Sequence, residues 1–221
     1  MRIPLLTTFM TVLTGIATAT GLAAKSHVPF PDPTVDESTE KSSGPETAVL
    51  AGGCFWGVEA VFERLKGVQD VVSGFSGGDK STARYETVSN GDTGHAESVK
   101  ITYDPKQITY GELLKVFFSV AHDPTELNRQ GPDTGTQYRS AIFYENEEQK
   151  KIAEGYIKQI EEARVFSKRI VTQVVPLKAF YAAEAYHQNF VARNPSYPYV
   201  FYNDLPKLGQ LKKLYPTMCK R

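Results

Sequence analysis

Cys54 is the residue of this sequence best suited to covalent chemistry, because of what lies on either side of it. It stands in the run Gly52-Gly53-Cys54-Phe55-Trp56-Gly57, which holds one of only two cysteines and the only tryptophan. The apolar stretch Thr47 to Ala51 precedes it, and apolar residues then recur at the spacing of a buried helix face: Val58, Val61, Phe62 and Leu65. Cys54 is therefore predicted just before a helix N-terminus, where backbone N–H groups and the helix dipole favour the reactive thiolate. Gly53 leaves room for a substrate to approach the backbone closely.

Taken alone, Cys54 has an ordinary alternative. A free cysteine is more commonly a small buried apolar residue than a nucleophile, and a tryptophan beside a phenylalanine is more commonly core. The run around Cys54 does not decide between these interpretations, so the rest of the chain must.

Three further motifs follow in order along the chain. Gly94-His95-Ala96-Glu97 places a carboxyl after a glycine turn, Gly131 to Ser140 reads GPDTGTQYRS, and Tyr186-His187-Gln188 lies near the end of the core. Together with Gly-Cys-Phe-Trp-Gly, this set resembles the methionine sulfoxide reductase A family, whose members reduce the S epimer of methionine sulfoxide. The resemblance runs from about Thr47 to Lys207, and several ordered motifs are far more specific than one pentapeptide.

The resemblance implies a role for each residue that sulfoxide reduction needs. The sulfur of a sulfoxide is electrophilic only when its oxygen is hydrogen-bonded or protonated, so a thiol nucleophile needs an acid and donors opposite it. Glu97 is the candidate acid, kept protonated by burial, and Tyr85 and Tyr138 are the candidate hydroxyl donors. The candidates for substrate contact or for a place beside the thiol are Phe55 and Trp56 around the substrate methyl, Gly53, His187, and Asp133 near the nucleophile.

Cys219, two residues from the end, is the other cysteine. In the family a C-terminal cysteine on a flexible tail commonly attacks the sulfenic acid left on the nucleophile, and Gly209 and Pro216 predict such an irregular tail. The resemblance thus implies a Cys54–Cys219 disulfide that an external thioredoxin or dithiol reduces, with no bound cofactor. Two alternatives remain: an exported binding domain in which the same disulfide is a fixed staple, and a thiol peroxidase, which is expected to place an arginine near the thiol.

Composition excludes some classes of partner. The 221 residues contain 25 basic and 25 acidic side chains, so nothing favours nucleic acid or an anionic membrane surface. The four histidines are scattered and no C-x-x-C pair occurs, so no metal site is predicted. The expected substrates are oxidised proteins or free methionine sulfoxide, and we expect a monomer.

The chain divides into four parts. Residues 1–24 carry one charge, a moderately apolar run and a small-residue end, which predicts a secretory signal peptide and hence export to the periplasm or cell envelope. An uncleaved N-terminal anchor and a disordered tail are the alternatives; after cleavage we expect no stable membrane association. Residues 25–46 predict a disordered linker, with a packed irregular arm as the alternative through Phe30. Residues 47–210 are predicted to form the catalytic domain. Residues 211–221 are predicted to form the tail, which carries Cys219 as the resolving cysteine, the one that attacks the sulfenic acid.

Strand and helix signals alternate through the core. Strands are predicted over about 47–51, 68–75, 97–103, 139–144 and 170–175, and helices over about 57–65, 111–121, 147–163 and 182–193. The first six elements give the order β-α-β-β-α-β, so the predicted class is α+β, a ferredoxin-like two-layer sandwich with additional helices and an irregular C-terminal tail. The chemistry gathers in two long connections, 75–94 and 122–137.

Overall fold

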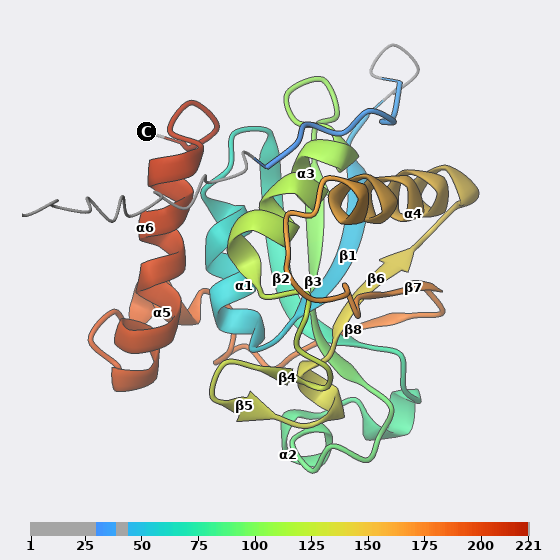
Figure 1. Ribbon diagram of the computed structural model, residues 1–221. Helices are drawn as coiled ribbons and strands as arrows, with labels where there is room; N and C mark the ends of the chain where they lie inside the picture. The colour runs from blue at the N-terminus through green and yellow to red at the C-terminus, as the bar shows by residue number, and fades with distance from the viewer. Residues whose placement is uncertain (1–29, 39–43, 221) are drawn as a thin grey trace, which may run out of the picture.

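The computed structural model describes residues 30–38 and 44–220, and these form an α+β fold around one six-stranded sheet (Figure 1). The strands of this sheet lie in the order β7-β6-β1-β3-β2-β8. All neighbouring strands are antiparallel except the parallel pair β6 and β7. The bounds are β1 Glu46–Gly52, β2 Val68–Ser76, β3 Ala96–Tyr103, β6 Ser140–Tyr144, β7 Gln173–Pro176 and β8 Phe180–Ala182. A separate two-stranded ribbon joins β4 Arg129–Gln130 to β5 Asp133–Thr134.

The helices cover one face of the sheet and extend beyond its edge. In Figure 1, α3 and α4 lie in front of the strands, and α6 stands beside α1 at the left. The α-helices are α1 Phe55–Glu63, α2 Tyr85–Val88, α3 Tyr110–Val116, α4 Glu147–Glu162, α5 Phe190–Arg193 and α6 Leu205–Leu214. Two π-helical turns, Phe117–Ala121 and Val200–Asp204, continue α3 and precede α6.

Alternation along the central strand sets the two faces. Ala48 and Leu50 of β1 belong to the main core between the sheet and helices α1, α3 and α4, whereas Val49 and Ala51 belong to a small cluster on the other face. All four side chains are fully buried, as a central strand covered on both faces requires. Burial on both faces fixes which residues of β1 pair with its neighbouring strands. Cys54 lies at the short junction between the end of β1 at Gly52 and the start of α1 at Phe55.

The helix predicted over Ala182 to Arg193 is wrong for most of its length. Ala182 ends β8, and only Phe190–Arg193 is helical. The side chain of Gln188 binds both the N–H and the carbonyl of Ser73 in β2, which fastens this segment to the sheet. Asn189 then takes a left-handed conformation with φ 53°, which breaks the helical path.

Part of the predicted disordered linker packs as an arm. Residues 30–38 cross α3 and α4, where Asp36 accepts a hydrogen bond from Gly111 N–H (2.8 Å) and Glu37 accepts one from Tyr110 N–H (2.7 Å). These are free donors of the first turn of α3, which carboxylates satisfy well. The sequence prediction fails here because Asp36 and Glu37, read as linker residues, accept hydrogen bonds from the first turn of α3, whose N-cap is Thr109. The predicted signal peptide lies outside the described residues.

The C-terminal tail is more ordered than predicted. Helix α6 includes Gly209 and runs to Leu214, so the irregular segment begins only at Tyr215. The tail then lies against the end of α1: Lys66 N–H donates to the Met218 carbonyl (2.8 Å), and Lys220 N–H donates to the Arg64 carbonyl (2.7 Å). Cys219 thereby forms an antiparallel bridge with Leu65. Among the described residues, no helix has the length and apolar character needed to cross a membrane.

Candidate active site

One cavity of about 210 Å³ brings together residues from five separate segments. Its walls include every residue predicted for acid, donor, nucleophile or methyl contact: Cys54, Phe55, Trp56, Tyr85, Glu97, Asp133 and Tyr138. Tyr197 and Tyr199 complete the lining. Helix α1 supplies the aromatic wall and β3 supplies Glu97. Tyr85 lies between β2 and β3, Asp133 and Tyr138 lie between α3 and β6, and Tyr197 and Tyr199 lie between α5 and α6. The sheet and α1 are the rigid parts, so the reactive sulfur and the buried carboxyl are held by regular structure.

Cys54 is the N-cap residue of α1, as predicted, but its sulfur is a thiol at rest. Burial raises the pKa of this thiol well above its usual value, and the carboxyl groups of Glu97, Asp204 and Asp133 raise the pKa further. The N–H of Trp56 at the helix N-terminus acts in the opposite direction but is outweighed. The predicted effect of the helix end in favour of the thiolate is therefore present but too small, because desolvation and nearby negative charge exceed it.

Glu97 is almost wholly buried and accepts a hydrogen bond from Phe55 N–H at 3.0 Å. Burial raises the pKa of this carboxyl to about 8, and Asp133 adds to the effect. The N–H of Phe55 lowers the pKa but does not restore it. Glu97 is thus a protonated acid at neutral pH, lying against the first turn of the helix that carries the thiol.

The tyrosine hydroxyls stay protonated and able to donate. Burial raises the pKa of Tyr85, Tyr138 and Tyr199 above the ordinary tyrosine value, and the neighbouring acidic groups raise it further. The hydroxyl of Tyr199 hydrogen-bonds the carboxylate of Asp133, so that carboxylate faces the cavity with one oxygen already occupied. The Tyr85 hydroxyl lies within hydrogen-bond reach of the Ser89 side chain, whereas the Tyr138 hydroxyl shows no protein acceptor among the hydrogen bonds of the described residues.

Tyr197, Tyr199 and Asp204 escaped the sequence analysis. The two tyrosines alternate with proline in Asn194-Pro195-Ser196-Tyr197-Pro198-Tyr199, and that composition is typical of an irregular aromatic loop. Asp204 is fully buried, both of its carboxyl oxygens lack a hydrogen-bond partner, and its pKa is raised to about 6 by burial. A single aspartate after an aromatic run gives no indication in the sequence that its side chain is buried.

Two predicted residues lie behind the cavity wall. His187 accepts a hydrogen bond from Trp56 Nε1 (3.0 Å) and packs against Phe55 and Tyr85, with ring centroids 5.1 and 4.3 Å apart. Gly53 has φ 89°, and a Cβ there would lie 2.5 Å from the side chain of Gln130. The space beside Gly53 is thus filled by protein, so the predicted room for substrate is absent at this residue.

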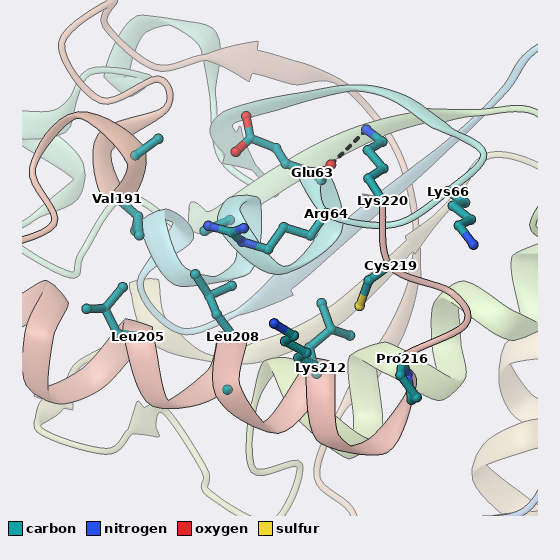
Figure 2. A pocket seen from close by; sticks show the side chains of 14 residues that line it. Glu63, Arg64, Lys66, Val191, Leu205, Leu208, Lys212, Pro216, Cys219 and Lys220 are labelled. Carbon is teal, nitrogen blue, oxygen red and sulfur yellow. Dashed lines mark hydrogen bonds between the residues drawn. The ribbon is translucent and has the colours of Figure 1, made fainter.

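Cys219 lies apart from the other predicted residues. The nine residues of α1 span about 14 Å, and Cys219 pairs with Leu65 beyond the far end of that helix. There it lines a second, larger cavity of about 1050 Å³ between α1, α6 and the tail. Figure 2 shows its side chain pointing toward α6, while Lys220 Nζ donates to the Glu63 carbonyl. Both cysteines are free thiols.

The cavity contains a nucleophile and an acid, and no cluster of metal-binding side chains occurs in the part of the chain described by the structure. Comparison with known proteins decides the family. The family model described as peptide methionine sulfoxide reductase matches residues 46–217. This chain belongs to the peptide methionine sulfoxide reductase family. As a member it is an oxidoreductase.

Individual relatives are similar to this reductase in sequence or structure over most of its length. Peptide methionine sulfoxide reductase MsrA 2 of Mesorhizobium japonicum is 60% identical over 175 residues, which is 79% of this chain and 90% of that protein. The protein of the same description from Synechocystis is 53% identical over 210 residues, or 93% and 98% of the two chains. Reduced Mxr1 from Saccharomyces cerevisiae is structurally similar, with a TM-score of 0.63, 34% identity, and coverage of 76% of this chain and 94% of that one.

Proposed function

We propose that this enzyme reduces methionine S-sulfoxide, free and in oxidised proteins, to methionine. The observation that carries the proposal is the single cavity that joins the Cys54 thiol, the protonated Glu97 carboxyl and the Phe55 and Trp56 rings. A sulfoxide placed there has its sulfur beside the nucleophile and its oxygen beside the acid, while its methyl group contacts the aromatic wall.

The first half-reaction moves one oxygen atom. The sulfur of Cys54 attacks the sulfoxide sulfur while Glu97, with Tyr85 and Tyr138 as further donors, protonates the sulfoxide oxygen. Glu97 regains a proton from the thiol, the substrate S–O bond breaks and a Cys54 S–O bond forms. The products are methionine and Cys54–S–OH, so the substrate sulfur is reduced by two electrons and Cys54 is oxidised by two.

The second half-reaction requires the tail to leave its position on α1. Condensation of the Cys54 sulfenic acid with the Cys219 thiol forms a disulfide and releases water. Because α1 separates the two thiols, the hydrogen bonds at Lys66 and Lys220 must break first. A thioredoxin-like dithiol then reduces the disulfide to two thiols and becomes a disulfide itself.

Geometry favours this reaction over the two alternatives. None of the nine residues that line the cavity is an arginine, whereas a peroxidase of the expected kind places one beside its thiol. A fixed Cys54–Cys219 staple is absent, since both thiols are free and lie at opposite ends of α1.

Activity on the two sulfoxide epimers tests the proposal directly. The dithiol-reduced protein is expected to convert methionine S-sulfoxide to methionine and to leave the R epimer essentially unreacted, because only one hand sets both methyl and oxygen against their partners. Chiral separation of the remaining sulfoxide measures this, and equal consumption of both epimers contradicts the proposal. A titration of free thiols before and after the S epimer gives an independent readout, because a staple or binding domain shows no change.

We further propose that the enzyme is exported and cut near Ala23 or Ala24. The one-charge N-terminal segment with a small-residue end supports this. Export to the periplasm or cell envelope then requires a thioredoxin-like donor in that compartment, and the mature enzyme is proposed to act as a monomer. The mass of the intact protein from its native cell tests the cleavage.

For the fold we propose the ferredoxin-like arrangement, which the strand order β6-β1-β3-β2 supports, with β7 and β8 added at the edges.

A further inference from the structure

The Trp56 ring has its hydrogen-bond acceptor and its stacking partner in one short segment of chain. Its Nε1 donates to His187 Nδ1 at 3.0 Å, and its ring stacks on Phe190 with centroids 3.8 Å apart and planes 10° apart. Trp56 is in the first turn of α1, so its backbone is fixed by the helix. Tyr197 and Tyr199 meet its ring edge-on, with centroids 6.3 and 6.0 Å away, whereas the hydrogen bond and the stacked contact both come from the segment that contains His187 and Phe190. Whatever places His187 and Phe190 therefore also sets the aromatic wall of the cavity.

The segment from His187 to Phe190 has little regular structure of its own. Gln188 fastens its start to β2 through Ser73, and Asn189 adopts a left-handed conformation. The N–H of Asn189 donates to Glu59 Oε2 at 3.0 Å. Glu59 lies on α1 three residues after Trp56, so one helix carries both the aromatic side chain and the carboxyl that holds its neighbours.

The environment of Glu59 is unfavourable for a carboxyl group. The side chain is 1% exposed, and no lysine, arginine or histidine forms an ion pair with it among the described residues. Burial raises its pKa to about 7, although the N–H groups of Asn189 and Phe190 and the Ser73 hydroxyl lie close enough to lower that pKa. Its other oxygen, Oε1, has no hydrogen bond of ordinary geometry. An apolar residue would occupy this helix face at a lower desolvation cost. The presence of a carboxyl at this position is explained if its oxygen is needed to accept the hydrogen bond from Asn189 N–H.

We propose that Glu59 is a positioning residue for the substrate wall: by binding Asn189 N–H it places Phe190 and His187, which together fix the orientation of Trp56. The proposal rests on the proposed function only in that the wall is taken to contact the sulfoxide methyl. Glu59 itself does not line the cavity.

The test uses the fact that Trp56 is the only tryptophan, so fluorescence excited at the long-wavelength edge, where the 12 tyrosines do not absorb, reports its surroundings alone. Glu59→Leu removes the acceptor, and we expect emission at longer wavelength and stronger quenching by iodide. In single turnover, the substrate concentration for half-maximal rate should rise about tenfold, a factor equivalent to roughly 1.4 kcal/mol, with a much smaller change in maximal rate. Glu59→Gln keeps an acceptor oxygen and should restore both readouts. Glu63→Leu, one turn further along α1, is the matched control and should change neither.

A double-mutant cycle separates positioning from general structural support. Phe190→Leu should raise the half-maximal concentration by itself, and adding Glu59→Leu should raise it little further, because both changes act on the same contact. Additive effects, or a Glu59→Leu protein with unchanged emission and unchanged half-maximal concentration, overturn the proposal. If Glu59→Leu does not fold, Glu59→Met replaces it, since that side chain has similar length and no carboxyl acceptor. Fluorescence decides the matter even if the wild-type protein reduces no sulfoxide, which would refute the proposed function instead.

Discussion

Burial gives the reacting groups of this site unusual protonation states at the scale of single residues. Glu97 holds a proton at neutral pH that an exposed glutamate would lose, and Cys54 holds one that a helix N-terminus alone would help to remove. Each group can therefore pass a proton toward the sulfoxide oxygen during attack, without a metal ion or bound cofactor in the scheme. The desolvation that makes this arrangement costly is the same property that makes it reactive.

Glu97→Gln should slow the release of methionine in single turnover by about 10²-fold, the usual contribution of a general acid, with a smaller change in substrate affinity. In the wild type the rate should fall as pH rises through about 8, because Glu97 then loses the proton that the oxygen needs. The variant should lack that alkaline decline. Rapid-quench measurement of methionine across the pH range checks both statements, and an unchanged rate would show that Glu97 does not act as the acid.

Asp204→Asn should lower the pKa of the Cys54 thiol, because it removes a buried negative charge that opposes the thiolate. The pKa of Asp204 is raised to about 6, so the carboxylate is charged in the alkaline range where the thiol titrates. The pH dependence of Cys54 alkylation by iodoacetamide, measured in a Cys219→Ser background, gives that pKa. Asp70→Asn, an exposed control, should leave the pH dependence unchanged; an unshifted curve for Asp204→Asn contradicts the prediction.

At the scale of elements, the sequence predicts the helices and strands that have a clear apolar periodicity. It does not predict the segments whose backbone depends on hydrogen bonds from distant side chains. The strands around β1, β2, β3 and β6 and the helix α4 follow from alternation or helical spacing, and the structure places them within one or two residues of the prediction. The segment before α5 fails because Gln188 binds a neighbouring strand, an interaction between residues 115 positions apart. The predicted effect of the helix end on Cys54 is outweighed for a similar reason, since the carboxyls that oppose it come from distant segments.

The arm of residues 30–38 should contribute to stability without contributing to catalysis. Asp36 accepts hydrogen bonds from Gly111 N–H and from Thr109 Oγ1 at the start of α3. Asp36→Ala should therefore lower the free energy of unfolding by about 1–2 kcal/mol, the usual order of loss when hydrogen bonds to a charged group are removed, and leave the rate of sulfoxide reduction unchanged. Ser38→Ala, at an exposed position two residues further along the arm, is the control for urea denaturation. A stability equal to that of the control variant would show that the arm is dispensable.

At the scale of the whole molecule, the two thiols are stored at opposite ends of one helix. The active-site cavity lies at the N-terminus of α1, and the Cys219 cavity lies beside its C-terminal half (Figure 2). Because the two thiols are separated, they form no disulfide, and Cys54 is free to react with substrate. It also means that catalysis by the proposed route alternates between a docked and a released tail.

Cys219→Ser should release one methionine per enzyme and then fail to turn over with thioredoxin, because attack on the sulfoxide needs only Cys54. Cys54→Ser should release none. Hydrogen exchange adds a structural readout: the amides of Lys66 and Lys220 are hydrogen-bonded in the docked tail and should be protected in the reduced enzyme. One equivalent of methionine S-sulfoxide should abolish that protection in the wild type, since the disulfide pulls the tail away, but not in Cys219→Ser. Normal turnover of Cys219→Ser with thioredoxin, or protection that survives in the oxidised wild type, would contradict a relay through this tail.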